Sequence, residues 1–112
     1  MGTNVKVLWL SRHEPDDRQV YELRRLFGDE VEVVQSNPKV RSGREVVKLM
    51  KESGCHEVIA VLPVYLLQQI CEAGVKPIKS TMDRRLNKFG KAEFIFKYFE
   101  RIEEVRIITT VL

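Results

Sequence analysis

The sequence lacks the features that mark membrane-spanning, secreted and disulfide-stabilised proteins. No apolar run reaches the roughly 20 residues that a membrane helix needs, and residues 1–10 contain no small-residue cleavage site of the secretory type. The two cysteines, Cys55 and Cys71, are too few for a disulfide framework. We therefore expect a protein of the reducing cytoplasm that has no membrane partner.

Common cofactor and metal motifs are also missing. No Gly-x-Gly-x-x-Gly follows the first apolar run, which argues against dinucleotide binding, and no Gly-x-x-x-x-Gly-Lys-Ser/Thr phosphate loop occurs. The histidines, His13 and His56, and the two cysteines do not have the spacing of zinc ligands. The sequence therefore predicts a protein that uses neither a metal ion nor an organic cofactor.

The chain has a balanced composition but an uneven distribution of charge. With 112 residues, 44% of them apolar and 31% charged, it is sized for one globular domain over residues 1–112. Residues 1–75 hold 10 basic and 11 acidic side chains, whereas residues 76–91 hold six basic side chains and one acidic. A local positive charge of this kind attracts anionic ligands. The alternative is a solvated basic face in a charge-rich protein.

Apolar runs alternate with amphipathic segments through the first three quarters of the chain. Short apolar runs of the strand type are separated by apolar stripes of helical spacing, with Ser or Asp before two of them and Gly after each. Three successive strand–helix units predict a parallel sheet with helices on both faces, which is a compact Rossmann-like α/β architecture. The expected strands cover residues 5–10, 31–35, 57–62 and 77–82, and the expected helices cover residues 16–28, 42–54 and 63–74.

The last quarter of the chain has a period of two. Phe94, Phe96 and Tyr98 alternate with other residues, and so do the apolar or β-branched residues at 105, 107, 109 and 111. This pattern predicts a C-terminal antiparallel strand pair. The link at residues 100–104 has no turn signal, so one long strand or a short helix there are alternatives. The density of aromatic residues calls for cover on both sides, which favours a homodimer.

Loops at the carboxyl ends of parallel strands are where Rossmann-like sheets bind ligands. We place the loops of residues 11–15, 35–39, 63–65 and 80–87 at this edge. The first contains Ser11, Arg12 and His13, our candidate catalytic residues. Arginine pairs well with phosphate, histidine transfers protons near neutral pH, and serine donates to a phosphate oxygen. The alternative is that Ser11 is a turn residue and that Arg12 and His13 are merely solvated.

Further candidate ligand-binding residues lie in these loops or, in the case of Lys79, directly before the fourth. Tyr65 could stack on a base, although the alternative that it covers the start of a helix is the stronger one. Three residues of the basic stretch are candidates for contacts with phosphate. The complete set of ligand-binding candidates is Glu14, Asn37, Tyr65, Lys79, Arg84 and Arg85.

One segment carries a resemblance to a known family. A Val-Leu-Trp-Leu strand at residues 7–10 runs directly into Ser11-Arg12-His13, in a chain of this length and element order. This arrangement resembles the small CRISPR-associated proteins of CARF-like type, some of which are ring nucleases in antiviral defence. The family motif has proline directly after the histidine, whereas Glu14 intervenes here before Pro15.

The resemblance implies a cyclic oligoadenylate ligand, bound by a two-fold homodimer and, in ring nucleases, cleaved without a metal. Cleavage would use the ribose 2′-hydroxyl as nucleophile on the adjacent phosphate and leave a 2′,3′-cyclic phosphate. In that reaction Arg12 would hold the phosphate, His13 would act as acid or base, and Ser11 would orient an oxygen.

Other functions remain open from the sequence. The same loops could form a nucleotide-sensing module without catalysis, because arginine and histidine serve both roles. The basic stretch of residues 76–91 could bind nucleic acid, although it lacks aromatic residues interleaved as in RNA-recognition motifs. The C-terminal strands could belong to a protein-interaction module.

Overall fold

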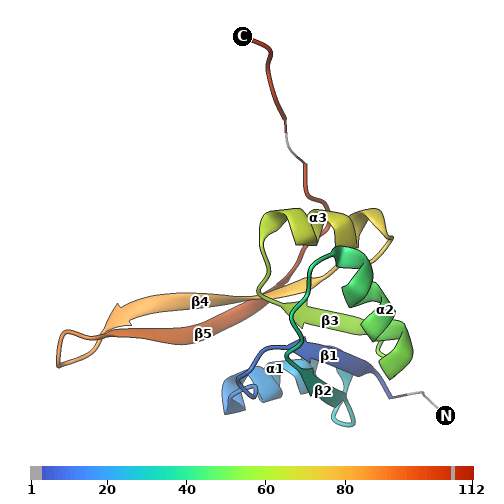
Figure 1. Cartoon of the computed structure of the whole chain (residues 1–112). Helices are drawn as coiled ribbons and strands as arrows, with labels where there is room; N and C mark the ends of the chain where they lie inside the picture. The colour runs from blue at the N-terminus through green and yellow to red at the C-terminus, as the bar shows by residue number, and fades with distance from the viewer. Residues whose placement is uncertain (1–3, 107) are drawn as a thin grey trace.

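The computed structural model describes residues 4–106 and 108–112 and contains five strands and three helices (Figure 1). Within these residues, none of the helices is both long and apolar enough to cross a membrane. In chain order the elements are β1 (Lys6–Leu10), α1 (Asp17–Phe27), β2 (Glu32–Ser36), α2 (Gly43–Ser53), β3 (Glu57–Ala60), α3 (Val64–Glu72), β4 (Ile78–Leu86) and β5 (Ala92–Arg101).

The strands form one mixed sheet in the order β2-β1-β3-β4-β5. The pairs β1–β2, β1–β3 and β3–β4 are parallel, and β5 lies antiparallel to β4. The predicted α/β class, with parallel strands and an antiparallel pair at the C-terminal side, is confirmed. The chain moves outward from β1 to β2 and then returns to the other side of β1, so the strand order reverses between β1 and β3. Open sheets bind ligands at such a reversal.

The alternation of side chains along the strands divides the core into two layers. Val7 and Trp9 of β1 face α1, whereas Leu8 between them faces α2 and α3, as the period of two requires. Helices therefore cover both faces of the sheet, as the sequence predicts. The α1 layer contains Val7, Trp9, Leu23, Ile59 and Ile78; the other layer contains Leu8, Val46, Met50, Val58, Ala60 and Ile70.

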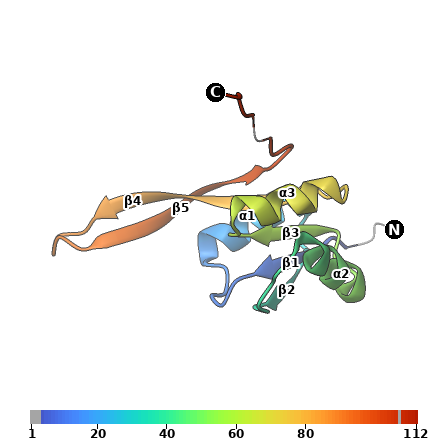
Figure 2. The same ribbon diagram turned by 45° about the horizontal axis from the view of Figure 1, so that its top comes forward.

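The middle of the basic stretch, including Lys79, Arg84 and Arg85, lies in a strand and not in a loop. Strand β4 continues to Leu86 and pairs with β5 along its whole length. The two strands leave the body as a long hairpin, which we call the arm (residues 82–97), in both views of the ribbon (Figures 1 and 2). The prediction that residues 80–87 form a loop at the sheet edge is therefore wrong.

The turn of the arm carries a signal that the sequence analysis missed. Asn87 Oδ1 accepts hydrogen bonds from the amides of Phe89 (2.8 Å) and Lys91 (3.0 Å). Gly90 adopts φ 73°, a left-handed conformation that favours glycine. A loop with an Asn side-chain turn and a left-handed Gly is a common hairpin connection. The antiparallel pair expected in the last quarter of the chain is therefore formed by β5 with the preceding strand, β4.

The expected strand over residues 105–111 is not formed. Residues 102–106 and 108–112 belong to no strand, and Ile107 lies outside the described residues. Among the described residues, the last backbone hydrogen bond between this end and the body joins the Ile102 amide to the Pro77 carbonyl at 2.8 Å, and Glu103 pairs with Lys76 Nζ at 2.7 Å. Beyond it the chain leaves the sheet (Figure 1). Alternation makes a strand only where a neighbouring strand supplies hydrogen-bond partners.

Helices α2 and α3 approach closely at Gly43, the first residue of α2. A Cβ at this position would lie 2.5 Å from the Gln69 Cβ and 2.7 Å from the Ile70 amide nitrogen. The Gly43 amide also donates to Gln69 Oε1 at 2.7 Å. Glycine is therefore required here by space and not by backbone conformation.

We predict that Gly43→Ala destabilises the protein by about 1–3 kcal/mol, the usual cost of overpacking. The physical reason is that backbone atoms of α3, which cannot rotate away, must shift. Urea unfolding followed by circular dichroism measures the change. Lys48→Ala, on the exposed side of α2, is the matched control. Equal stability of the two variants would contradict the close approach.

Candidate functional site

A cavity of about 310 Å³ opens at the carboxyl ends of β1 and β3, beside the first half of β4. It lies on the α1 side of the sheet, between β1 and β4, and therefore at the reversal of strand order. This volume is at the lower end of the range for small-ligand sites. Its lining comes from β1 and the following loop (Trp9, Leu10, Ser11, His13, Glu14), from the start of α1 (Asp16, Gln19), from β3 (Ile59, Ala60, Val61) and from β4 (Ser80, Met82).

The loop after β1 is folded back onto the end of its own strand. The Trp9 indole Nε1 donates to the His13 carbonyl at 2.8 Å, and the His13 amide donates to Ser11 Oγ at 3.1 Å. The Gln35 side chain of β2 donates to the Ser11 carbonyl at 3.1 Å. These three hydrogen bonds hold the Ser11–His13 segment at the mouth of the cavity.

Gln19 connects the start of α1 to β4 across the cavity. Its backbone amide donates to Asp16 Oδ1 (2.8 Å), and its side-chain Oε1 accepts from the Asp16 amide (2.9 Å), which is a reciprocal capping box. Its Nε2 donates to Ser80 Oγ at 3.4 Å. Gln19 is 7% exposed, the one buried polar side chain in the described part of the chain. Its amide and the Ser80 hydroxyl therefore supply fixed polar groups in a wall that Trp9, Ile59 and Met82 make largely apolar.

The three candidate catalytic residues are neighbours, but they do not all face the cavity. Ser11 and His13 line it, whereas Arg12 is exposed and is not part of the lining. The Arg12 Nε donates to His13 Nε2 at 3.3 Å, so the two side chains are in contact outside the mouth. The expectation that Arg12 and His13 both line a pocket holds for His13 and not for Arg12.

The candidate ligand-binding residues are dispersed. Glu14 lines the cavity, but Asn37 (after β2) and Tyr65 (first turn of α3) are exposed residues outside its lining. Lys79 and Arg85 lie on the opposite face of β4, because Ser80 and Met82 face the cavity and side chains alternate.

Lys79 and Arg85 each have a carboxylate nearby. Lys79 Nζ lies 3.9 Å from Glu100, and Arg85 lies 3.7 Å from Asp83. Arg84 instead shares the cavity face of β4, one position beyond Met82 on that face. Of the three basic candidates, Arg84 is therefore the one that the strand directs toward the cavity side.

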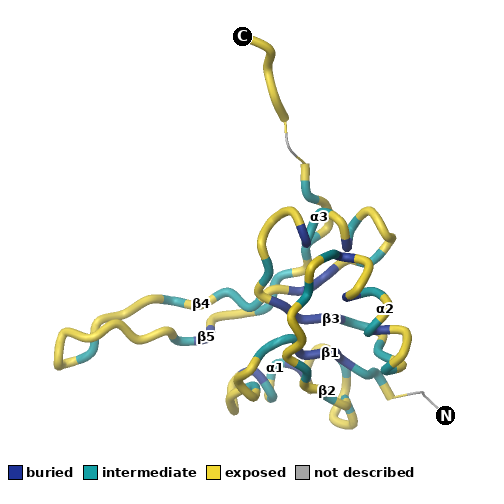
Figure 3. The backbone as a smooth tube through the Cα atoms, viewed as in Figure 1, coloured by how far each residue is buried: buried dark blue, intermediate teal, exposed yellow. Residues whose placement is uncertain are grey.

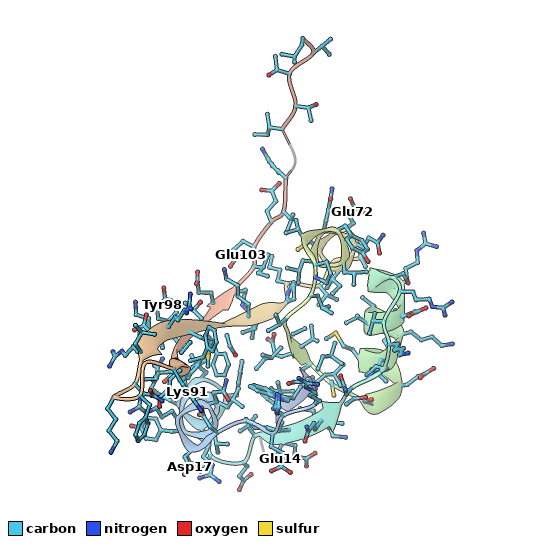
Figure 4. The ribbon with its side chains drawn as sticks, turned by 60° about the vertical axis from the view of Figure 1, so that its left-hand side comes forward. Glu14, Asp17, Glu72, Lys91, Tyr98 and Glu103 are labelled. Atoms are coloured by element: carbon cyan, nitrogen blue, oxygen red, sulfur yellow. The ribbon has the colours of Figure 1, made fainter. Side chains whose placement is uncertain are left out.

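The mouth of the cavity has an acidic side and a basic side. Glu14 and Asp16 belong to the lining, and Asp17 follows at the first turn of α1. Figure 4 shows Glu14 and Asp17 at one end of the molecule, far from Glu72 and Glu103. The Asp16 carboxylate caps the amide end of α1, so this end of the helix is not free to bind a phosphate. An anion would have to approach from the side of Arg12 and Arg84.

Several residues of the site were missed from the sequence. Trp9, Ile59 and Met82 form part of the apolar wall, and all three lie within the strands expected over residues 5–10, 57–62 and 77–82. Gln19 had a detectable signal, since Asp16 and Gln19 have the spacing of a capping box. Nothing local indicates that Gln19 and Ser80, 61 positions apart, share one cavity.

Comparisons of the chain with protein-family models, with curated proteins and with solved structures find no match to any of them.

Neither cysteine has the environment of a reactive thiol. Burial raises the pKa of the Cys55 thiol. Burial, assisted by the charges of Glu104 and Glu72, raises the pKa of the Cys71 thiol. A raised pKa leaves less thiolate at neutral pH, and the thiolate is the nucleophile.

We predict that both thiols react with iodoacetamide at neutral pH several-fold more slowly than glutathione does. The rate should rise as the pH is increased past the ordinary thiol pKa of about 8.5. Mass spectrometry of the alkylated protein over time measures it. The urea-unfolded chain is the control and should react at the ordinary rate. Faster reaction in the folded state would contradict the assignment.

Proposed function

We propose that the protein binds a cyclic oligoadenylate, with an adenine base in the cavity and a phosphate at its basic side. The observation that carries the proposal is a cavity at the strand reversal with apolar walls and a His–Ser pair at its mouth. Rossmann-like sheets place ligands at such a reversal. The resemblance of residues 7–13 to CARF-like proteins supplies the class of ligand.

The chemistry of the lining supports an adenine ring inside the cavity and a phosphate at its mouth. Trp9, Ile59 and Met82 offer apolar contact to a planar ring, and the Gln19 and Ser80 side chains offer hydrogen bonds to its edge. Glu14 and Asp16 repel a phosphate from one side. Arg12 and Arg84 then remain as the cations that attract it.

Cleavage of the ring is the reaction that this arrangement favours. His13 Nε2 accepts a hydrogen bond from Arg12, so it presents a lone pair, as a general base requires. When Arg12 turns to a phosphate, Nε2 becomes available to take the proton of the ribose 2′-hydroxyl. The 2′-oxygen–phosphorus bond forms, the bond from phosphorus to the 5′-oxygen breaks, and that oxygen takes a proton from solvent. Ser11, which lines the same cavity, would orient a phosphoryl oxygen.

The single tryptophan of the chain gives a direct test of binding, because Trp9 lines the cavity. We expect cyclic tetra- or hexa-adenylate to change Trp9 fluorescence saturably. Inorganic phosphate at the same concentration is the control and should have little effect. If neither cyclic oligoadenylate changes the fluorescence, and calorimetry detects no heat of binding, the proposal fails.

Arg84 and Arg85 form a matched pair, since they are adjacent on β4 but face opposite sides. We predict that Arg84→Ala raises the Kd for the cyclic oligoadenylate about tenfold, or about 1.4 kcal/mol. Arg85→Ala should change it less than twofold, because Arg85 faces away and lies beside Asp83. Fluorescence titration of both variants measures the difference. Equal effects would place the phosphate elsewhere.

We predict that His13→Ala slows ring opening about 100-fold or more, the usual loss of a general base. Binding should change little, because the apolar wall remains. Chromatography of the products, with wild-type protein as control, separates intact ring from linear fragments. A ring that co-elutes intact with the wild-type protein would show sensing without cleavage. Cleavage by His13→Ala at the wild-type rate would overturn the role of His13.

A further inference from the structure

One face of the arm places a cation beside an aromatic ring. Arg84 of β4 is paired with Phe94 of β5, and Leu86 is paired with Ala92. Directly paired residues of an antiparallel ribbon project from the same face. Arg84 and Phe94 are therefore neighbours on one face, which also carries Met82 and Leu86. We call it the mixed face of the arm (residues 82, 84, 86, 92 and 94).

The aromatic rings of the outer arm are exposed. Phe94 is 67% exposed and Phe89, in the turn, is 75% exposed, whereas Phe96, nearer the body on the same side as Phe94, is 7% exposed. Figure 3 shows the outer part of the arm exposed along both strands. A phenyl ring that its own chain leaves open offers a surface on which a planar ligand can stack.

The arm has an excess of positive charge. Residues 82–97 hold five basic and two acidic side chains. Arg84, Lys88 and Lys91 are exposed and form no ion pair within residues 4–106 and 108–112. The Lys88 Nζ lies 5.1 Å from the centroid of the Phe89 ring, which is a cation–π contact. A cation therefore accompanies each of the two exposed rings.

The two carboxylates of the arm lie on its opposite face. Asp83 lies 3.7 Å from Arg85 and 3.5 Å from Lys97. Glu93 is paired with Arg85 across the strands. The cations of this face are thus neutralised by carboxylates on the same face. The excess positive charge of the arm belongs to the mixed face and the turn.

Exposed rings with unpaired cations fit a single-stranded nucleic acid. Such ligands are bound by aromatic side chains that stack on bases and by cations that neutralise phosphates. A ribbon that reads a duplex needs hydrogen-bonding groups at the base edges, and Met82, Leu86 and Phe94 offer none. An anionic lipid surface fits less well, because Arg84 lies between the apolar side chains and would have to enter the hydrocarbon with them.

We propose that the mixed face and the turn of the arm bind a single-stranded nucleic acid. Bases stack on Phe94 and Phe89, and phosphates lie beside Arg84, Lys88 and Lys91. The basic stretch lacks aromatic residues interleaved along the chain, but strand pairing supplies Phe94 next to Arg84. RNA and DNA share this chemistry. The inference does not depend on the cyclic oligoadenylate proposal.

Fluorescence anisotropy of a labelled, mixed-sequence oligonucleotide of about 12 nucleotides tests the inference. We expect the full chain to bind the single strand saturably at low ionic strength, and tighter binding of RNA or of DNA identifies the natural ligand. Because three cations meet phosphates, the logarithm of the association constant should fall with the logarithm of salt concentration with a slope of about −2. The same sequence as a blunt duplex should bind severalfold more weakly.

Three outcomes of this experiment would overturn the inference. The first is that neither single strand binds. The second is that the duplex binds as tightly as the single strand, which would exclude stacking. The third is that phosphatidylserine vesicles bind the chain and the single strands do not, which would assign the face to a membrane.

Substitutions at Phe94 separate stacking from apolar contact. Phe94→Leu keeps an apolar side chain without a ring, and it should raise the Kd for the single strand about tenfold. Phe94→Trp keeps a ring and should bind like wild type. Tyr65→Ala, which removes an exposed aromatic side chain from α3, is the control and should leave the Kd unchanged. Equal Kd values for Phe94→Leu and Phe94→Trp would contradict stacking.

The lysines of the turn test the phosphate contacts. Lys88→Ala with Lys91→Ala should raise the Kd and reduce the salt slope from about −2 to about −0.7, since one cation of three remains. Lys39→Ala with Lys51→Ala removes the same charge from exposed lysines outside the arm and should leave the slope unchanged. An unchanged slope in the arm variant would overturn the assignment. Neither arm lysine lines the cavity, so this test and the cyclic oligoadenylate titration can fail independently.

Discussion

The position of Trp9 is the constraint on which the rest of the structure depends. Its ring is 5% exposed and packs in the α1 layer, with its centroid 6.2 Å from that of Phe99 in an edge-to-face contact. Its indole N–H donates to the His13 carbonyl. One side chain of β1 thus joins the core, the inner part of β5 and the loop at the cavity. A change at Trp9 would be felt in all three.

The same geometry explains why polar groups gather at one edge of the sheet. Parallel strands end together, and the strand reversal leaves a gap there that neither helix layer fills. Gln19 and Ser80 place hydrogen-bonding groups inside this gap, and Asp16 occupies the amide end of α1. The fold alone names no ligand, because Rossmann-like sheets serve many chemistries. The function proposed here therefore depends on the particular side chains at the mouth.

Met82 relates the cavity to the arm. It lines the cavity and lies on the mixed face of the arm, whose outer part has no cover within the chain. The cavity and the arm therefore share one side chain.

The sequence by itself determined the strand–helix alternation, an aspartate cap for α1 at position 16 or 17, and the place of Ser11 and His13 after the first strand, because these depend on local periodicity and capping. The structure places the cap at Asp16. It predicted a terminal strand wrongly and placed the basic stretch in a loop, although Asn87 and Gly90 carried a turn signal. Only the tertiary structure decided that β4 pairs with β5, that Arg84 and Lys79 face opposite sides, and that Gln19 meets Ser80. Strand pairing and cavity lining depend on contacts between residues far apart in the chain, and local patterns do not encode which distant segments become neighbours.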